Sequence, residues 1–213
     1  MKISKFVQTI KNTGQCAVIH APGEIYLSTG YSIYKAPELP DITGMSQIAA
    51  VLDVEPKKLK KIHIEEYHCK DKADMRGFDL SEYPHGELEV SRMDVAAVVG
   101  ENIYAVFLCP DNGEMIFFDE SLLAPIKDRI KKEDAYIDYT ARIHPKGYKY
   151  IVVKDGIEVL AAILPVKVLS EKYIKDLREF YIRCADQYTG QQADAIINAA
   201  EQGIQEEATE DNE

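Results

Sequence analysis

The sequence contains no tryptophan and only four cysteines among its 213 residues. The cysteines are too far apart to form any Cys-x-x-Cys pair: Cys16, Cys69, Cys109 and Cys184. A zinc site built from paired cysteines therefore has no basis in the sequence, and a disulfide framework is not expected. We expect these residues to be buried free thiols.

Long apolar segments are also absent. The longest apolar run, Val159–Val166, is far shorter than the roughly 20 residues that a membrane-spanning helix needs. The N-terminal residues, MKISKFVQTIKNTG, lack the apolar centre of a signal peptide. These features predict a cytoplasmic protein with no membrane partner.

Common enzymatic motifs are missing as well. The sequence has no Gly-x-x-x-x-Gly-Lys-Ser/Thr phosphate loop, no Gly-x-Gly-x-x-Gly, no Gly-x-Ser-x-Gly and no His-Glu-x-x-His. We therefore predict a protein without a cofactor that binds or assembles rather than catalyses. An enzyme of an unrecognised type remains an alternative.

Acidic residues outnumber basic ones, and the formal net charge is −11. Six of the acids lie in Glu201–Glu213, which contains no lysine or arginine. Residues 1–200 hold 25 basic and 30 acidic residues and so carry a net charge of −5. This balance argues against broad nonspecific binding of nucleic acid, but it leaves room for a local basic surface.

The best-defined stretch is Ala135–Val166, which predicts three antiparallel strands. In its first part apolar and polar residues alternate, so one face should be buried and the other wet. A turn at His144–Gly147 leads to a second strand, and the Asp155-Gly156 pair predicts a tight hairpin. The third run, Ile157–Val166, is apolar on both faces and should be a central strand.

The rest of the first 168 residues predicts short helices and strands. Helices are expected over residues 4–12, 43–55, 91–100 and 121–132, and hairpins around Ala21-Pro22-Gly23 and Asp111-Asn112-Gly113. The helix over 91–100 is expected because Ser91-Arg92-Met93-Asp94 fits a capping box. Residues 69–85 are irregular and look like a connection.

We therefore predict an α+β protein with antiparallel sheet and short helices, forming one domain over residues 1–168. A helix over 169–190 should follow, since Ser170 can cap it and apolar residues recur at helical spacing. Residues 191–213 should form an acidic, partly disordered tail.

Two segments of the first domain resemble each other. CAVIHAPGEIYL (Cys16–Leu27) and YAVFLCPDNGEMIFF (Tyr104–Phe118) share Ala-Val in a strand, a proline before the turn and Gly-Glu after it, at an offset of about 88 residues. An internal pseudo-duplication would give two similar halves, 1–69 and 87–168. Convergence is the alternative, because short hairpins often share this pattern.

In element order, the second half is similar to the β-α-β-β-β units of DNA polymerase sliding clamps, whose helices face the DNA. This resemblance implies a clamp-like accessory acting on DNA or replication proteins, and a ring would need several such chains. FDESLLAPIKD (Phe118–Asp128) and DGIEVLAAILP (Asp155–Pro165) resemble small uncharacterised proteins of bacterial phages and mobile elements. That resemblance implies an accessory protein of unknown role that need not bind DNA.

The function predicted first is thus a non-enzymatic binding or assembly protein of clamp-like type, with the accessory role as the alternative and an enzyme third. Six basic residues are candidates for contacts to nucleic-acid phosphates: Lys5, Lys11, Lys127, Arg129, Lys131 and Lys132. They fall on two predicted helices, and two such helices side by side can track a phosphate backbone. Asp128 and Glu133 interrupt the second cluster, so an ordinary solvated helix face is the more frequent outcome.

The apolar stripe of the C-terminal helix is a candidate partner-binding face made of Tyr173, Leu177, Phe180 and Cys184. Docking of this stripe on the chain's own core is our first expectation. Self-association through it is the second.

Two further polar groups favour a structural role. On a strand, one face would carry His63, Glu65, Tyr67 and Cys69. No second pair of ligands is visible, so we predict no metal site. Another strand would carry Tyr136, Asp138, Thr140 and Arg142 on its polar face. Cross-strand ion pairing is the commoner use of such a row, and we name no catalytic residue.

Overall fold

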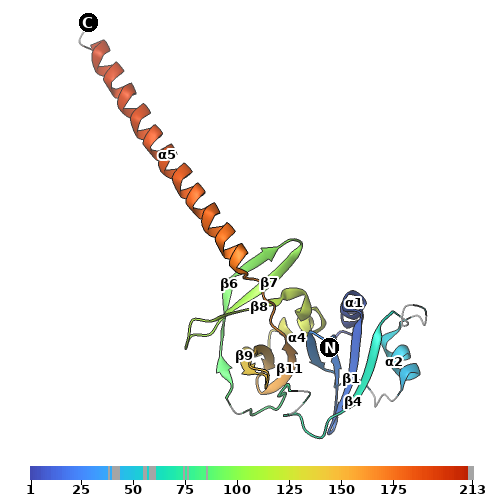
Figure 1. The fold of residues 1–213 in the computed structure, drawn as a ribbon. Coiled ribbons are helices and arrows are strands. Elements are labelled where there is room, and N and C mark those ends of the chain that lie inside the picture. The colour runs from blue at the N-terminus through green and yellow to red at the C-terminus, as the bar shows by residue number, and fades with distance from the viewer. Residues whose placement is uncertain are drawn as a thin grey trace. The chain divides into compact units, whose positions relative to one another are not determined.

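The computed structural model describes residues 1–37, 39, 44–54, 57, 61–73, 75, 77–84 and 86–210. The chain forms two units, Met1–Val166 and Lys167–Glu213. Helices and a mainly antiparallel sheet make up the first unit, so the predicted α+β class is confirmed (Figure 1).

The helices and strands of the first unit are α1 (Ile3–Thr13), β1 (Gln15–Ala21), β2 (Glu24–Ser28), β3 (Ser32–Lys35), α2 (Met45–Leu52), β4 (His63–His68), β5 (Leu88–Glu89), β6 (Ser91–Val99), β7 (Asn102–Leu108), β8 (Met115–Asp119), η1 (Glu120–Ile126), α4 (Lys127–Ile130), β9 (Ile137–Ile143), β10 (Lys149–Asp155) and β11 (Glu158–Ile163). The element η1 is a 3₁₀ helix that continues directly into α4.

An eight-stranded sheet forms the centre of this unit, in the order β4-β1-β2-β3-β11-β10-β9-β5. The β1–β4 pair is parallel, and the other neighbours are antiparallel. The strands β9, β10 and β11 are those predicted between Ala135 and Val166, which confirms that prediction. Gly156, at φ 60°, lies in the predicted tight turn, across which Asp155 pairs with Glu158.

Apolar side chains cover both faces of the eight-stranded sheet. Ile151 and Val152 are neighbours on β10 but belong to different core clusters, because successive side chains of a strand point to opposite faces. The larger cluster includes residues of α1, α2, η1, β7 and β8. The smaller cluster is closed by Met75 and Leu80, which are 0% and 1% exposed. These two residues belong to the segment 69–85, so the expected connection also covers the second face of the sheet.

A separate three-stranded sheet has the order β6-β7-β8. Here the sequence prediction was wrong, because residues 91–99 form strand β6 instead of a helix. Val99 pairs with Asn102 across a two-residue turn, and Gly100 stands at its first central position with φ 63°. Glycine is favoured there in hairpin turns. The hydrogen bonds to β7 thus override the local capping-box pattern.

The two similar segments both form antiparallel hairpins, β1–β2 and β7–β8. Their surroundings differ, since helix α1 precedes the first hairpin and strand β6 precedes the second. The hairpins also belong to different sheets. The predicted order of the second half, strand, helix and three strands, is present as β8, η1–α4 and β9–β11. The elements before the hairpins therefore differ, whereas a helix and then a strand come later in both cases, α2 and β4 after the first hairpin and η1–α4 and β9 after the second. The internal pseudo-duplication stays a prediction.

The second unit contains helix α5 (Glu171–Glu210). Ser170 caps it as predicted, because its hydroxyl accepts a hydrogen bond from the backbone N–H of Tyr173 at 3.2 Å. The helix was expected to end at Gly190, but it continues to Glu210. A single glycine costs about 1 kcal/mol relative to alanine inside a helix, which is too little to end a long one. The rest of the expected tail, residues 211–213, lies outside the described residues.

Within the described part of the chain, no helix is both long enough and apolar enough to cross a membrane.

Candidate nucleic-acid interface

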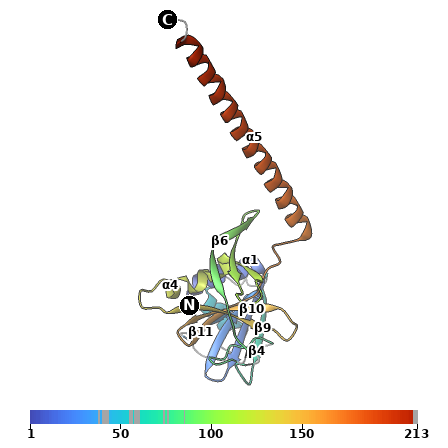
Figure 2. The ribbon, with the colours of Figure 1, turned by 90° about the vertical axis from the view of Figure 1, so that its left-hand side faces the viewer.

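Helix α1 packs on the sheet through an apolar face and exposes its lysines on the other. Phe6 and Ile10 are buried, and the ring of Phe6 meets Tyr34 of β3 edge-on, with ring centres 6.0 Å apart. The start of α1 is anchored to η1, since the backbone N–H of Lys2 donates to the carbonyl oxygen of Pro125 at 2.7 Å. Both ribbon views place α1 and α4 on the same side of the eight-stranded sheet (Figure 1, Figure 2). The two lysine-bearing helices predicted from the sequence are therefore neighbours.

The segment η1–α4 begins where strand β8 ends. Asp119 caps it, because its carboxylate accepts a hydrogen bond from the backbone N–H of Ser121 at 2.9 Å. Leu122 and Ile126 are buried beneath the segment. The hydroxyl of Tyr34 donates to the carbonyl oxygen of Leu122 at 2.6 Å. Apolar packing and a buried hydrogen bond thus hold the segment on the sheet.

Two adjoining pockets lie along these helices, with volumes of about 470 and 600 Å³. Both are lined by Asn102, Asp119, Ser121 and Ala124. We call the two pockets together the α1–α4 surface. Its side chains that can donate to an anion include Lys5, Gln8, Thr9, Asn12, Asn102, Ser121, Lys127 and Lys131.

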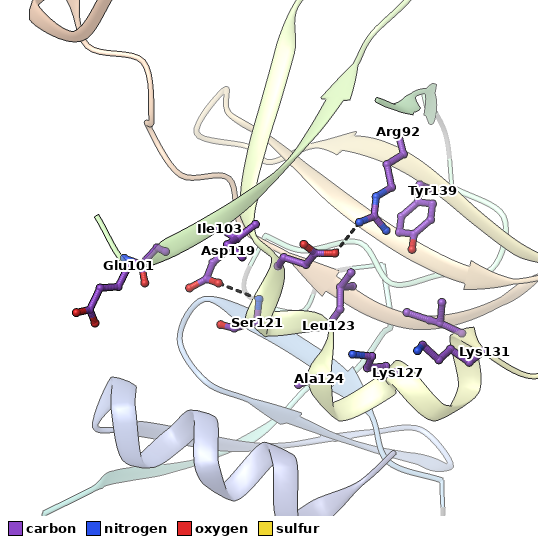
Figure 3. A pocket seen from close by; sticks show the side chains of 13 residues that line it. Arg92, Glu101, Ile103, Asp119, Ser121, Leu123, Ala124, Lys127, Lys131 and Tyr139 are labelled. Atoms are coloured by element: carbon purple, nitrogen blue, oxygen red, sulfur yellow. Dashed lines mark hydrogen bonds and ion pairs between the residues drawn. The ribbon is translucent and has the colours of Figure 1, made fainter. Parts of the chain in front are cut away.

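The structure brings three of the six predicted basic residues to this surface. Lys127 and Lys131 lie near each other on the helical segment and line the first pocket (Figure 3). Lys5 lines the second pocket from α1. All three are exposed, and none of them forms an ion pair with another described residue. Their charges are therefore available to a ligand.

The other three basic residues lie elsewhere. Lys11 and Lys132 are exposed but line neither pocket. Arg129 donates to the carboxylates of Asp155 at 3.1 Å and Glu158 at 3.0 Å. The hydrogen bond from Arg129 lowers the pKa of the Asp155 carboxyl group. Because Arg129 belongs to this ion-pair network, we remove it from the set of phosphate contacts.

Two acids of the α1–α4 surface have partners within the chain. Glu120 accepts a hydrogen bond of 2.6 Å from Arg92, and Asp119 is the cap of η1 (Figure 3). Glu101, in the β6–β7 turn, is exposed. Neither histidine nor cysteine is among the described residues that line the two pockets. The surface thus offers cations, amides and hydroxyl groups, which suit the binding of an anion.

Sequence reasoning missed the part of this surface that comes from β6 and β7, including Arg92, Asn102 and Ile103. Arg92 was placed on a helix that does not form. The pair Gly100-Glu101 lies between two apolar runs, and that pattern is typical of a two-residue hairpin. It is the signal that could have located these residues.

The polar row predicted on β9 makes ion pairs and hydrogen bonds. Asp138 lies opposite Lys154 on β10, and their side chains are 3.7 Å apart. Thr140 and Arg142 both donate to one carboxylate oxygen of Glu87, at 2.7 and 2.8 Å. This agrees with the structural role that the sequence favoured.

The same row was expected to be exposed to solvent, but Thr140 and Arg142 are only 6% and 3% exposed. Arg142 also donates to the backbone carbonyl of Asp79 at 2.7 Å, so residues before β5 cover this face of the strand. Tyr136 precedes β9 and is 77% exposed.

The strand face that carries His63 and Glu65 contains local hydrogen bonds. The His63 Nε2 atom lies 3.0 Å from Glu65 Oε1, and the Tyr67 hydroxyl donates to the other oxygen of the same carboxylate. Cys69 lies just beyond the end of β4. These contacts are the ordinary pairings of a polar strand face.

The predicted apolar stripe does occupy one face of α5, because its members are spaced four, three and four residues apart within this helix: Tyr173, Leu177, Phe180 and Cys184. Leu177 and Phe180 are 45% and 66% exposed. Among the described residues, α5 is the one helix or strand of its unit. The described residues of that unit therefore include no second helix or strand that could cover the stripe, and docking and self-association both stay predictions.

No family model matches the chain, and neither a curated protein nor a solved structure is significantly similar to it.

Proposed function

We propose that the chain is a non-enzymatic accessory protein that binds DNA through the α1–α4 surface. The observation that carries the proposal is the position of Lys5, Lys127 and Lys131. They come from helical segments far apart in the sequence, line two adjoining pockets and have no ion pair with another described residue.

The chemistry around these lysines supports phosphate contact. Gln8, Thr9 and Asn12 of α1 line the second pocket, and Ser121 lines both. Side chains of these types, together with lysine, supply most contacts to phosphate oxygens in DNA complexes. Such contacts position a protein on the duplex without reading its sequence. The proposal is therefore binding to the DNA backbone.

The net charge of −11 limits this binding to the local surface. Acidic residues elsewhere repel a polyanion, so the affinity should be weak at physiological salt and should increase steeply as salt is lowered. DNA binding should therefore be measured at low salt, where the affinity is highest.

Charge reversal at the first pocket tests the proposal. Fluorescence anisotropy of a short labelled duplex at low salt should show binding by the parent chain and its loss in Lys127→Glu/Lys131→Glu. The matched control is Lys70→Glu/Lys146→Glu, which changes the net charge equally at two exposed lysines outside both pockets. Equal loss in both variants would show that only the overall charge matters, and that result contradicts the proposal.

In the clamp-like version of this proposal, several copies of the chain also assemble around the duplex. Light scattering with and without DNA tests that addition separately. A strict monomer in both measurements removes the ring and leaves the DNA-binding surface to be judged by anisotropy.

A further inference from the structure

The ends of β1 and β4 bring together two histidines and a glutamate that are far apart in the sequence. His20 and His68 are direct register partners in this parallel pair of strands. Glu66 precedes His68 by two residues and therefore lies on the same face of β4. The opposite face of β4 carries His63 and Glu65.

The three side chains converge. His20 Nε2 lies 3.0 Å from Glu66 Oε1, and His68 Nε2 lies 3.8 Å from the same oxygen. The two imidazole rings are stacked, with centres 4.6 Å apart. One nitrogen or oxygen from each residue can be chosen so that all lie within 4.8 Å of one another. Within the described residues, no other three metal-binding side chains meet this condition.

Neighbouring groups hold part of this cluster in place. The side chain of His20 is only 11% exposed, so packing restricts its ring. The second carboxylate oxygen of Glu66, Oε2, accepts a hydrogen bond from the backbone N–H of Gly44 at 3.3 Å. Hydrogen bonds of this kind orient the ligands in metal sites. A metal ion lies in the plane of each imidazole that binds it, so the stacked His68 ring has to rotate before both histidines can bind one ion, and its 71% exposure leaves room for that rotation.

We propose that these residues bind a zinc ion through His20 Nε2, Glu66 Oε1 and His68 Nε2. With zinc bonds of about 2.0–2.1 Å in a tetrahedral site, neighbouring ligand atoms are roughly 3.4 Å apart. The separations from Glu66 Oε1 to the two histidine nitrogens, 3.0 and 3.8 Å, lie on either side of that value. Imidazole nitrogens suit zinc, whereas calcium and magnesium prefer sites made of oxygen.

Three protein ligands leave a fourth position for water or another oxygen ligand. His20 and His68 also line a cavity of about 640 Å³, together with Lys35. The fourth ligand enters from this cavity. The zinc site has no residue in common with the α1–α4 surface, so this inference is independent of the DNA-binding proposal.

Direct titration of the full chain tests the site. The protein carries no polyhistidine tag and is stripped of metal with a chelator before Zn²⁺ alone is added in a calorimeter. We expect one zinc ion per chain. His68→Ala should weaken zinc binding by at least about 100-fold, since loss of an outer-shell partner alone costs roughly 10–100-fold. Glu66→Gln, which keeps the shape of the side chain, should also weaken it.

His63→Ala is the matched control, because His63 lies on the same strand, is equally exposed at 71% and faces the other way. It should bind zinc like the parent chain, and circular dichroism should show all variants folded. Absence of zinc binding at micromolar concentration, or an equal loss in His63→Ala, would overturn the site. So would a Co²⁺ derivative with an intense sulfur-to-metal absorption band, since that places the ion on cysteine.

Discussion

The hydroxyl of Tyr34 donates a hydrogen bond of 2.6 Å to the carbonyl oxygen of Leu122 and so ties η1 to the central sheet. Tyr34 is 0% exposed. Removing the hydroxyl leaves a buried carbonyl without this donor, which costs about 1–3 kcal/mol of unfolding free energy. We expect Tyr34→Phe to lose that amount in urea denaturation. Tyr136→Phe, at an exposed position, should stay within about 0.5 kcal/mol of the parent chain.

The carboxyl group of Glu24 should make folding stability depend on acid pH. Burial alone would raise its pKa, but hydrogen bonds from Tyr26, Lys35 and Lys72 lower it from 4.5 to about 2. The pKa is lower in the folded chain, so the stabilisation is present above about pH 4.5 and is lost as the pH falls toward 2. Its full size is roughly 3 kcal/mol.

Urea denaturation of Glu24→Gln at a series of pH values checks this expectation. Between about pH 5 and 2.5 the variant should lose less stability than the parent chain. Glu133→Gln, at an exposed position, is the control and should follow the parent. Parallel pH profiles for the parent and Glu24→Gln would show that Glu24 is not the group responsible.

The pair formed by Arg142 and Glu87 should be strongly coupled. Arg142 is 3% exposed and donates to Glu87 through Nε at 3.0 Å and Nη2 at 2.8 Å. Replacing one member of a buried ion pair costs about 3–5 kcal/mol when the other charge is left alone. Here the loss should fall at or below the lower end of that range, because Glu87 keeps its hydrogen bond from the Lys154 ammonium at 2.7 Å. Arg142→Met should show that loss. The double variant Arg142→Met/Glu87→Gln should lose clearly less than the sum of the single variants, and strict additivity would contradict the coupling.

A substitution in the apolar stripe of α5 distinguishes docking within the chain from self-association of chains. If it docks within the chain, as we expect, Leu177→Ala lowers the melting temperature at every protein concentration. If chains self-associate through the stripe, the melting temperature of the parent depends on concentration and Leu177→Ala reduces the mass measured by light scattering. Dispersal of an oligomer with unchanged stability would rule out docking.

Local patterns predicted the parts of the fold in which neighbours in sequence are also neighbours in space. The strands between Ala135 and Val166 follow from alternation and from Asp155-Gly156, and the cap at Ser170 follows from its position before apolar residues at helical spacing. The helix prediction for residues 91–99 was wrong because Ser91-Arg92-Met93-Asp94 fits a helix start, whereas hydrogen bonds to β7 stabilise a strand.

Long-range contacts account for what the sequence did not reveal. Lys5 and Lys127 line adjoining pockets because α1 packs against η1. His20 reaches His68 through a parallel strand pair, and no local pattern specifies which strands pair in parallel. The burial of Arg142 likewise requires Glu87 from another part of the chain.

The salt dependence of DNA binding tests the central claim most directly. Each phosphate contact contributes about 0.9 to the slope of log K against log salt for duplex DNA. Replacing Lys5, Lys127 and Lys131 together by alanine should make the slope shallower by roughly 3. Equivalent replacement of exposed lysines elsewhere, Lys70, Lys146 and Lys172, should leave it unchanged. An identical slope for the parent and the first triple variant, or no salt-dependent binding at all, would contradict the account.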